Sequence, residues 1–160
     1  MKSKTKFIIQ AAVIAAIYVV LTLVSSALGL SSGVIQVRFS EVLTILPIFT
    51  PAAIPGLFVG CILANLISGS IIIDVVFGSL ATLLGAIFTR ILKKHRMLAT
   101  LPPVLANATI VPFILVCGYG ITGSYWYFVM TVGLGEIISC CILGGLFITA
   151  LCRFEKHIFK

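Results

Sequence analysis

Charged residues are scarce in this chain, and acidic residues are rarer still. Of its 160 residues only 9% are charged and only four are Asp or Glu, whereas 61% are hydrophobic. The mean hydropathy is +1.27. Too little polar surface remains to cover a soluble globule, so the composition excludes a soluble domain. It predicts an integral membrane protein.

Catalytic and metal-binding motifs are also missing. The sequence contains no Gly-rich nucleotide loop, no HExxH and no Ser/His/Asp set, so we expect neither an enzyme nor ATP hydrolysis by this chain. Its five cysteines lie in apolar runs without metal-ligand spacing and are interpreted as small buried hydrophobic residues. Its two histidines lie in basic segments with no carboxylate at ligand spacing. We therefore expect no metal and no cofactor.

The positive charges are confined to short segments. Ten of the eleven Lys and Arg residues form three clusters. The clusters are Lys2, Lys4 and Lys6; Arg90, Lys93, Lys94 and Arg96; and Arg153, Lys156 and Lys160. Positive charge near the ends of membrane spans stays cytoplasmic, so both termini and residues 90–96 are predicted to share the cytoplasmic side. An even number of spans must then separate each cluster from the next.

The remaining cation, Arg38, falls on the opposite side in this scheme, three residues before Glu41. The net charge of +7 is spread over three loops and forms no basic helix face, so a nucleic-acid partner is not expected. The anionic inner leaflet of the membrane is the expected neighbour of the clusters.

The apolar segments between the clusters predict a single all-α membrane domain over residues 1–160. Its six transmembrane helices are expected at residues 7–28, 39–49, 54–68, 73–92, 100–118 and 124–152. The apolar stretch 38–64 is too long for one span of about 20 residues and is interrupted by prolines, so it is divided into two helices. The prolines are Pro47, Pro51 and Pro55.

Glu136 is the strongest single-residue indication of function. It lies about twelve residues into the sixth predicted helix, or roughly 18 Å, near the middle of the bilayer. A carboxylate at that depth costs about 2.5 to 3.5 kcal/mol and needs a partner or a polar cavity. Gly133 and Gly135 remove side chains beside it and leave room for a flat ligand. Ligand recognition is favoured over the alternative, a protonated Glu bonded to a neighbouring helix.

Four other polar residues are candidates for substrate binding, each with a structural alternative. Asn107, midway along the fifth predicted helix, could contact a ligand or clamp two helices together. Asp74 opens the fourth helix, where a carboxylate also complements the helix dipole. Arg38 and Glu41 are spaced i, i+3 and could pair with each other at the start of the second helix.

Aromatic residues gather at the outer edge of the last two predicted helices. They are Tyr119, Tyr125, Trp126 and Tyr127. Such residues form the aromatic belt at a membrane interface. Aromatic rings that face a cavity would also stack on a planar heterocycle, and the sequence leaves both interpretations open.

Small residues follow the first predicted helix at helical spacing. Ala11, Ala12, Ala15 and Ala16 form two overlapping Ala-xxx-Ala pairs on adjoining faces. Small residues let another helix approach closely, and this contact is a main source of helix association in lipid. A similar row follows the fourth helix: Gly78, Ala81, Thr82, Gly85 and Ala86. One row could pack inside the protein; if both did, most of this smooth surface would be internal, so an external helical partner is expected.

Several segments together resemble a known family. They are the Ala-xxx-Ala first helix, Val37-Arg38-Phe39-Ser40-Glu41-Val42-Leu43-Thr44, Phe49-Thr50-Pro51-Ala52-Ala53-Ile54-Pro55-Gly56-Leu57-Phe58, Asp74-Val75-Val76-Phe77-Gly78-Ser79-Leu80-Ala81-Thr82 and Gly133-Leu134-Gly135-Glu136. Over essentially its whole length the chain resembles the QueT-like family, substrate-binding S components of energy-coupling factor (ECF) transporters assigned to queuosine precursors. This resemblance implies a six-helix bundle, an outward-facing pocket formed by the first loop and helices four to six, and no ATPase activity.

The resemblance also implies partners, a location and a substrate. The chain would act in the bacterial cell membrane with the transmembrane coupling protein EcfT and two ECF ATPases, docked on the Ala-rich face of the first helix. The substrate would be a 7-deazaguanine such as preQ1, preQ0 or queuine. Glu136 would accept the adjacent N–H and amino groups of the guanine-like edge. Glu41 or Asp74 would meet the ammonium of preQ1, with Asn107 on the carbonyl edge and Trp126 or Tyr125 stacked on the ring.

Two other classes of function remain open. A proton-coupled or channel-like homo-oligomer would also use a lone intramembrane Glu, and it would transport its substrate unaided. A small intramembrane enzyme is disfavoured, because no nucleophile and base occur at adjacent depths.

Overall fold

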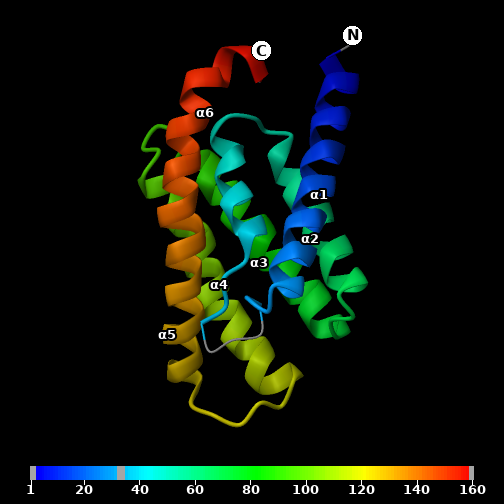
Figure 1. Cartoon of the computed structure of the whole chain (residues 1–160), viewed down its shortest axis with the longest axis vertical. Helices are drawn as coiled ribbons and strands as arrows, with labels where there is room; N and C mark the ends of the chain where they lie inside the picture. The colour runs from blue at the N-terminus through cyan, green and yellow to red at the C-terminus, as the bar shows by residue number, and fades with distance from the viewer. Residues whose placement is uncertain (1–2, 32–34, 159–160) are drawn as a thin grey trace.

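The computed structural model describes residues 3–31 and 35–158, and this part of the chain consists of helices joined by turns and irregular segments, without a β-strand. The elements in chain order are α1 Ser3–Ala27, η1 Phe39–Ile48, α2 Ala53–Ile67, α3 Ile72–Ile91, η2 Leu98–Thr100, α4 Leu101–Phe113, η3 Ile114–Gly118, α5 Tyr125–Glu136, η4 Ile137–Leu143 and α6 Gly144–Ile158. The all-α prediction is confirmed. The last predicted helix is one long rod made of α5, η4 and α6, and its middle part, η4, is π-helical (Figure 1).

Four of the helical segments are long and apolar enough to cross a membrane, which agrees with an integral membrane protein. They are Lys4–Ala27, Ile72–Ile91, Leu98–Gly118 and Tyr125–Arg153. The two other apolar helices, η1 and α2, have only 10 and 15 residues. At about 2.0 and 1.5 Å per residue they extend roughly 20 and 22 Å, less than the ~30 Å hydrocarbon core. The count of six spans therefore stays a prediction.

The short helix η1 lies inside the bundle, and all its residues from Leu43 to Ile48 are buried. Irregular backbone at membrane depth is tolerated when protein surrounds it. At its C-terminal end, Nη1 of Arg90 donates to the carbonyl oxygens of Pro47 and Ile48 at 2.9 and 3.1 Å. The guanidinium thus satisfies carbonyls near Pro51, which has no N–H to offer them.

The segments that carry the basic clusters meet at one end of the bundle. α1 begins and α6 ends there (Figure 1). The segment after α3 joins them, since the guanidinium of Arg96 lies 5.5 Å from the ring centre of Phe49 and is hydrogen-bonded to the Cys152 thiol. We call this the basic end; Lys2 and Lys160 lie outside the described residues. The arrangement agrees with a shared cytoplasmic side for both termini, which stays a prediction.

α1 and α2 cross closely because glycine meets alanine at the crossing. A Cβ added to Gly56 would lie 2.7 Å from the carbonyl oxygen of Ala11, and one added to Gly60 would lie 3.1 Å from Cα of Ala15. These two alanines therefore form an inner pair that packs against α2. The outer pair, which is exposed, consists of Ala12 and Ala16.

Candidate functional site

Two adjoining compartments, which share Gln36, Arg38, Asp74 and Val111 in their linings, lie on the side of the bundle away from the basic end (Figure 1). The outer chamber has a volume of about 270 Å³. Its lining residues are Thr22, Ser26, Ser31, Gln36, Arg38, Asn65, Ser68, Ser70, Asp74, Val111, Ile114, Leu115, Tyr119 and Ile121. The inner cleft has room for about 10 Å³, the space of about one water. It is lined by Gln36, Arg38, Glu41, Cys61, Asp74, Gly78, Thr82, Asn107, Val111, Val132 and Glu136.

Five of the residues predicted to bind substrate come together in the inner cleft. They are Arg38, Glu41, Asp74, Asn107 and Glu136. They come from the approach to η1, from η1 itself and from α3, α4 and α5, elements far apart in the sequence. Polar side chains in an otherwise apolar bundle have thus been gathered into one place, which is the arrangement that a polar ligand requires.

Glu41 is the most deeply buried of the three acids that line the inner cleft, with only 2% of its surface exposed. The Tyr18 hydroxyl of α1 donates to its Oε1 at 2.6 Å, and Nδ2 of Asn107 donates to its Oε2 at 3.5 Å. Both carboxylate oxygens therefore have a donor from another helix. Asn107 therefore links α4 to η1 through Glu41 and also lines the inner cleft, so its position is compatible with both of the roles suggested by the sequence.

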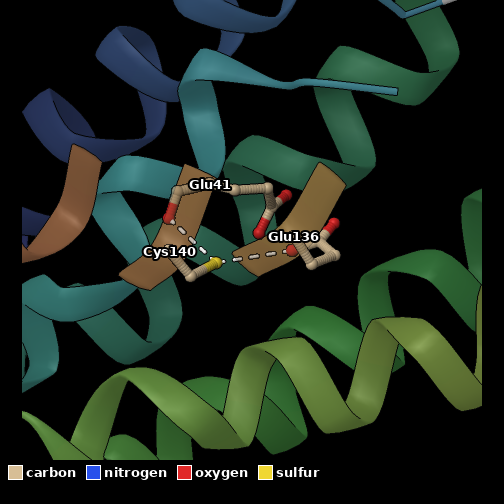
Figure 2. A group of neighbouring side chains, drawn as sticks. All are labelled: Glu41, Glu136 and Cys140. Carbon is tan, nitrogen blue, oxygen red and sulfur yellow. Dashed lines mark hydrogen bonds between the residues drawn. The ribbon is translucent and has the colours of Figure 1, made fainter. Parts of the chain in front are cut away.

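Glu136 ends α5 and lies beside Glu41, with the Cys140 thiol between them (Figure 2). Sγ of Cys140 is 3.4 Å from Oε2 of Glu136 and 3.6 Å from the backbone oxygen of Glu41. One ligand atom from each residue lies within 4.8 Å of the others. Two ionised carboxylates at such separations repel, and a ligand that donates N–H groups to them relieves the repulsion.

The same three residues could be considered as metal ligands, because they supply two carboxyl groups and a sulfur atom. Metal ligation by cysteine needs the thiolate, however. Sγ of Cys140 lies at hydrogen-bond distance from Oε2 of Glu136 and from the Glu41 carbonyl, and its single S–H proton can serve one of these acceptors at a time. These contacts form a carboxyl–thiol hydrogen-bond network, and metal ligation would require the thiol to lose the proton on which that network depends.

Asp74 lies in the first turn of α3, at the junction of the two compartments, and is 8% exposed. The Tyr119 hydroxyl donates to its Oδ2 at 2.9 Å. Burial, and then the hydrogen bond to Asp74 and its negative charge, raise the pKa of the Tyr119 hydroxyl above its usual value of 10.0. The hydroxyl therefore keeps its proton and remains a donor.

Arg38 also lies at the junction and lines both compartments. Over residues 3–31 and 35–158 its guanidinium makes no hydrogen bond and no ion pair, so the i, i+3 pair with Glu41 is not formed. A cation of this kind, facing a cavity beside three carboxyl groups, is available to a ligand.

Gly135 allows the backbone of Gln36, in the loop between α1 and η1, to pack directly against α5. A Cβ added to Gly135 would lie 1.9 Å from the carbonyl oxygen of Gln36, so only glycine allows the chain to pass here. The room that the sequence suggested for a ligand beside Gly135 is thus filled by the backbone of Gln36. At Gly133 an added Cβ would meet only Cβ of Ala108, at the ordinary contact distance of 3.7 Å.

The two aromatic candidates lie elsewhere. Tyr125 and Trp126 are not among the residues that line the outer chamber or the inner cleft. Trp126 is 74% exposed, and its ring packs edge-on against the Tyr125 ring with the ring centres 5.7 Å apart. The Tyr125 hydroxyl donates to the carbonyl of Thr109 at 2.9 Å. This placement is typical of an interfacial aromatic belt.

Sequence analysis missed two residues that help to build the site. Tyr18 holds Glu41, and Asn65 lines the outer chamber and donates to the backbone oxygen of Asp74 at 3.4 Å. Asn65 could have been found by the reasoning applied to Asn107, because it is an amide inside an apolar helix. Tyr18 carried no such signal, since tyrosine is common in membrane helices near interfaces.

Comparison with known proteins places the chain in a family. Queuosine precursor transporter QueT of Lactococcus lactis subsp. cremoris (strain MG1363) is 39% identical over 82 residues, which are 51% of this chain and 48% of that protein. The matched part thus spans about half the length of this curated relative. No solved structure matches the chain. The family model described as QueT transporter matches residues 8–153, and the chain therefore belongs to the QueT transporter family.

Proposed function

We propose that this chain is the substrate-binding subunit of an ECF-type importer in the bacterial cell membrane, and that its substrate is a queuosine precursor, a 7-deazaguanine such as preQ1, preQ0 or queuine. Family membership and the name of the Lactococcus relative support a transport role. The observation that carries the binding role is the inner cleft, where three carboxyl groups, an amide and a guanidinium converge next to a chamber of about 270 Å³.

The chemistry of the cleft suits the edge of a guanine-like base. Such an edge presents an N–H and an amino group side by side, and one carboxylate can accept both. Glu136 has acceptor capacity to spare, because one of its partners is the weak donor Cys140 and the other, the Asn107 amide, is shared with Glu41. Glu41 is already held by Tyr18 and Asn107. The ring would occupy the outer chamber, with its donor edge directed into the cleft toward Glu136.

The partner module would be EcfT with two ECF ATPases, because the sequence has no ATP-binding motif of its own. The exposed outer pair, Ala12 and Ala16, offers a smooth surface where a helix of EcfT can approach closely. The inner pair is committed to α2. Of the four alanines predicted for docking, the outer pair thus remains accessible to a partner.

Uptake of a labelled 7-deazaguanine into membrane vesicles tests this assignment. Vesicles that contain the chain, EcfT and both ATPases should accumulate the label when ATP is supplied on the side of the membrane where the ATPases are bound. Vesicles that contain the chain alone should not. Replacing both Ala12 and Ala16 by Trp should abolish uptake and leave ligand binding by the purified chain unchanged, because the bulky rings separate the docked helices. Uptake by the chain alone would favour the unaided proton-coupled or channel-like transporter.

A further inference from the structure

We infer that Tyr18 is a positioning residue that decides which of two neighbouring acids receives the donor edge of the substrate. Its hydroxyl group holds Glu41 from α1 and so leaves Glu136 as the acceptor for the ligand. This inference rests on the proposed function and deepens it, because it names the residue that sets which acid recognises the base. Tyr18 lines neither the outer chamber nor the inner cleft, so it acts through Glu41 and not by contact with the ligand.

Glu41 and Glu136 have similar surroundings in the inner cleft. They are 2% and 7% exposed, and both line the cleft beside Arg38. The Asn107 amide is shared by the two carboxyl groups. Sγ of Cys140 lies within reach of Oε2 of Glu136 and of the backbone oxygen of Glu41. Burial, the guanidinium, the amide and the thiol therefore do not decide which of the two acids accepts hydrogen bonds from a ligand.

The Tyr18 hydroxyl group distinguishes the two acids. Among the hydrogen bonds of residues 3–31 and 35–158, it is the side-chain donor that serves one of the two carboxyl groups and not the other. It donates to Oε1 of Glu41 at 2.6 Å, a distance typical of strong bonds from a hydroxyl group to a carboxylate. Glu41 would have to turn away from Tyr18 to offer both oxygens to a guanine-like edge. Glu136 can accept the two donors of that edge without losing such a bond.

The Tyr18 ring cannot follow Glu41 if the carboxyl group turns, because the ring is packed where α1 crosses α2. Tyr18 is 1% exposed, and a Cβ added to Gly60 would lie 2.9 Å from its Cβ. Rotation of Glu41 toward the ligand would therefore take the acceptor away from a buried hydroxyl group, which is unfavourable. The structural alternative is that the hydrogen bond only joins α1 to η1 and has no influence on which acid binds the ligand.

Comparison of the two acids with and without the Tyr18 hydroxyl group tests this role. Tyr18→Phe removes the hydroxyl group and keeps the ring. Isothermal titration calorimetry of the purified full-length chain with 7-aminomethyl-7-deazaguanine gives the dissociation constants. In the otherwise wild-type chain, the loss of affinity caused by Glu136→Gln should exceed the loss caused by Glu41→Gln by about tenfold. Combined with Tyr18→Phe, the two losses should agree within about threefold, because Glu41 is then free to accept from the ligand.

The matched control is Tyr127→Phe, which removes an exposed hydroxyl group outside both compartments and should leave the tenfold difference in place. If the tenfold difference persisted with Tyr18→Phe, Tyr18 would serve the fold alone and the inference would be wrong. Equal losses for Glu41→Gln and Glu136→Gln in the otherwise wild-type chain would also overturn it. Tyr18→Met, which fills the same space without a hydroxyl group, replaces Tyr18→Phe if a combined variant does not fold. Absence of binding by the wild-type chain would instead remove the proposed function.

Discussion

The two ends of the bundle use charged side chains in opposite ways. At the basic end Lys93, Lys94, Arg96 and Arg153 are exposed, and Arg90 completes the backbone by donating to the last carbonyls of η1. At the other end Glu41, Asp74 and Glu136 are each more than nine-tenths buried and face a cavity. The first arrangement satisfies groups that belong to the protein itself. The second leaves acceptors and a guanidinium available, so charge at this end is placed for a ligand.

This difference predicts that substitutions at the two ends affect different measurements. Changes around the inner cleft and outer chamber should alter the dissociation constant of the ligand more than the stability of the chain. Changes at the basic end should alter stability or topology and leave ligand affinity close to that of the wild type.

Gly135→Ala should have the largest effect. The added Cβ would overlap the carbonyl oxygen of Gln36, 1.9 Å away, and would push the segment that carries Arg38 off α5. We expect ligand affinity to fall by about a hundredfold or more, because a backbone clash in a packed site costs several kcal/mol. Isothermal titration calorimetry measures the loss. Gly133→Ala is the matched control and should bind normally, since its Cβ has room; equal affinities for the two variants would show that the first loop does not shape the site.

Glu136→Gln should weaken ligand binding by about tenfold to a hundredfold. An amide presents a donor where the ligand also donates, and loss of a charge-assisted hydrogen bond costs about 1.5 to 3 kcal/mol. The control is Glu155→Gln, at the acid that lies between Arg153 and Lys156 in the C-terminal basic cluster. Unchanged affinity in a folded Glu136→Gln variant would move base recognition to another residue.

Arg90→Ala should lower stability and hardly change binding. Without the guanidinium, the carbonyls of Pro47 and Ile48 lose their donor, and leaving buried acceptors unpaired costs about 1 to 3 kcal/mol. The midpoint of thermal unfolding in detergent should fall, while the ligand dissociation constant stays within about threefold of the wild type. The exposed neighbour Lys94 provides the control, as Lys94→Ala should change neither quantity. A large loss of affinity in Arg90→Ala would mean that the two ends are not independent.

Single cysteines introduced at the two ends should have the smallest effect on binding, and their accessibility to a labelling reagent reports which end of the bundle faces outward. The exposed native Cys117 and Cys152 would first be replaced by Ser. Ser124→Cys, beside the outer loop, should react with a membrane-impermeant maleimide in intact cells, whereas Lys94→Cys should react only after the membrane is opened. Labelling of Lys94→Cys in intact cells would reverse the predicted orientation.

The helical framework could be predicted from sequence because its signals are local. Long apolar runs, prolines and basic clusters mark where helices begin and end, and the structure has helices in all six predicted segments. The geometry of η1 was not evident, because an apolar run with a proline does not distinguish a spanning α-helix from a short buried 3₁₀-helix. That distinction depends on what surrounds the segment.

The site could be predicted in part for a different reason. An ionisable residue or amide in an apolar helix is costly and needs a partner or a polar cavity, and this reasoning singled out Glu136 and Asn107, which line the inner cleft. That they bind the substrate stays a prediction. Tertiary contacts could not be found in the same way. The structure shows that Ala11 and Ala15 face α2 and that the backbone of Gln36 passes over Gly135. Both contacts depend on how the helices cross, and a single sequence contains no pattern that reports the crossing geometry.

The most direct test of the account is equilibrium dialysis of the purified wild-type chain, without EcfT or ATPases, against a radiolabelled 7-deazaguanine that carries an aminomethyl group. The account predicts saturable binding of one ligand molecule per chain, with competition by the unlabelled base. Absence of saturable binding, or binding that appears only when the ATPases are added, would contradict the claim that this chain alone forms the recognition site.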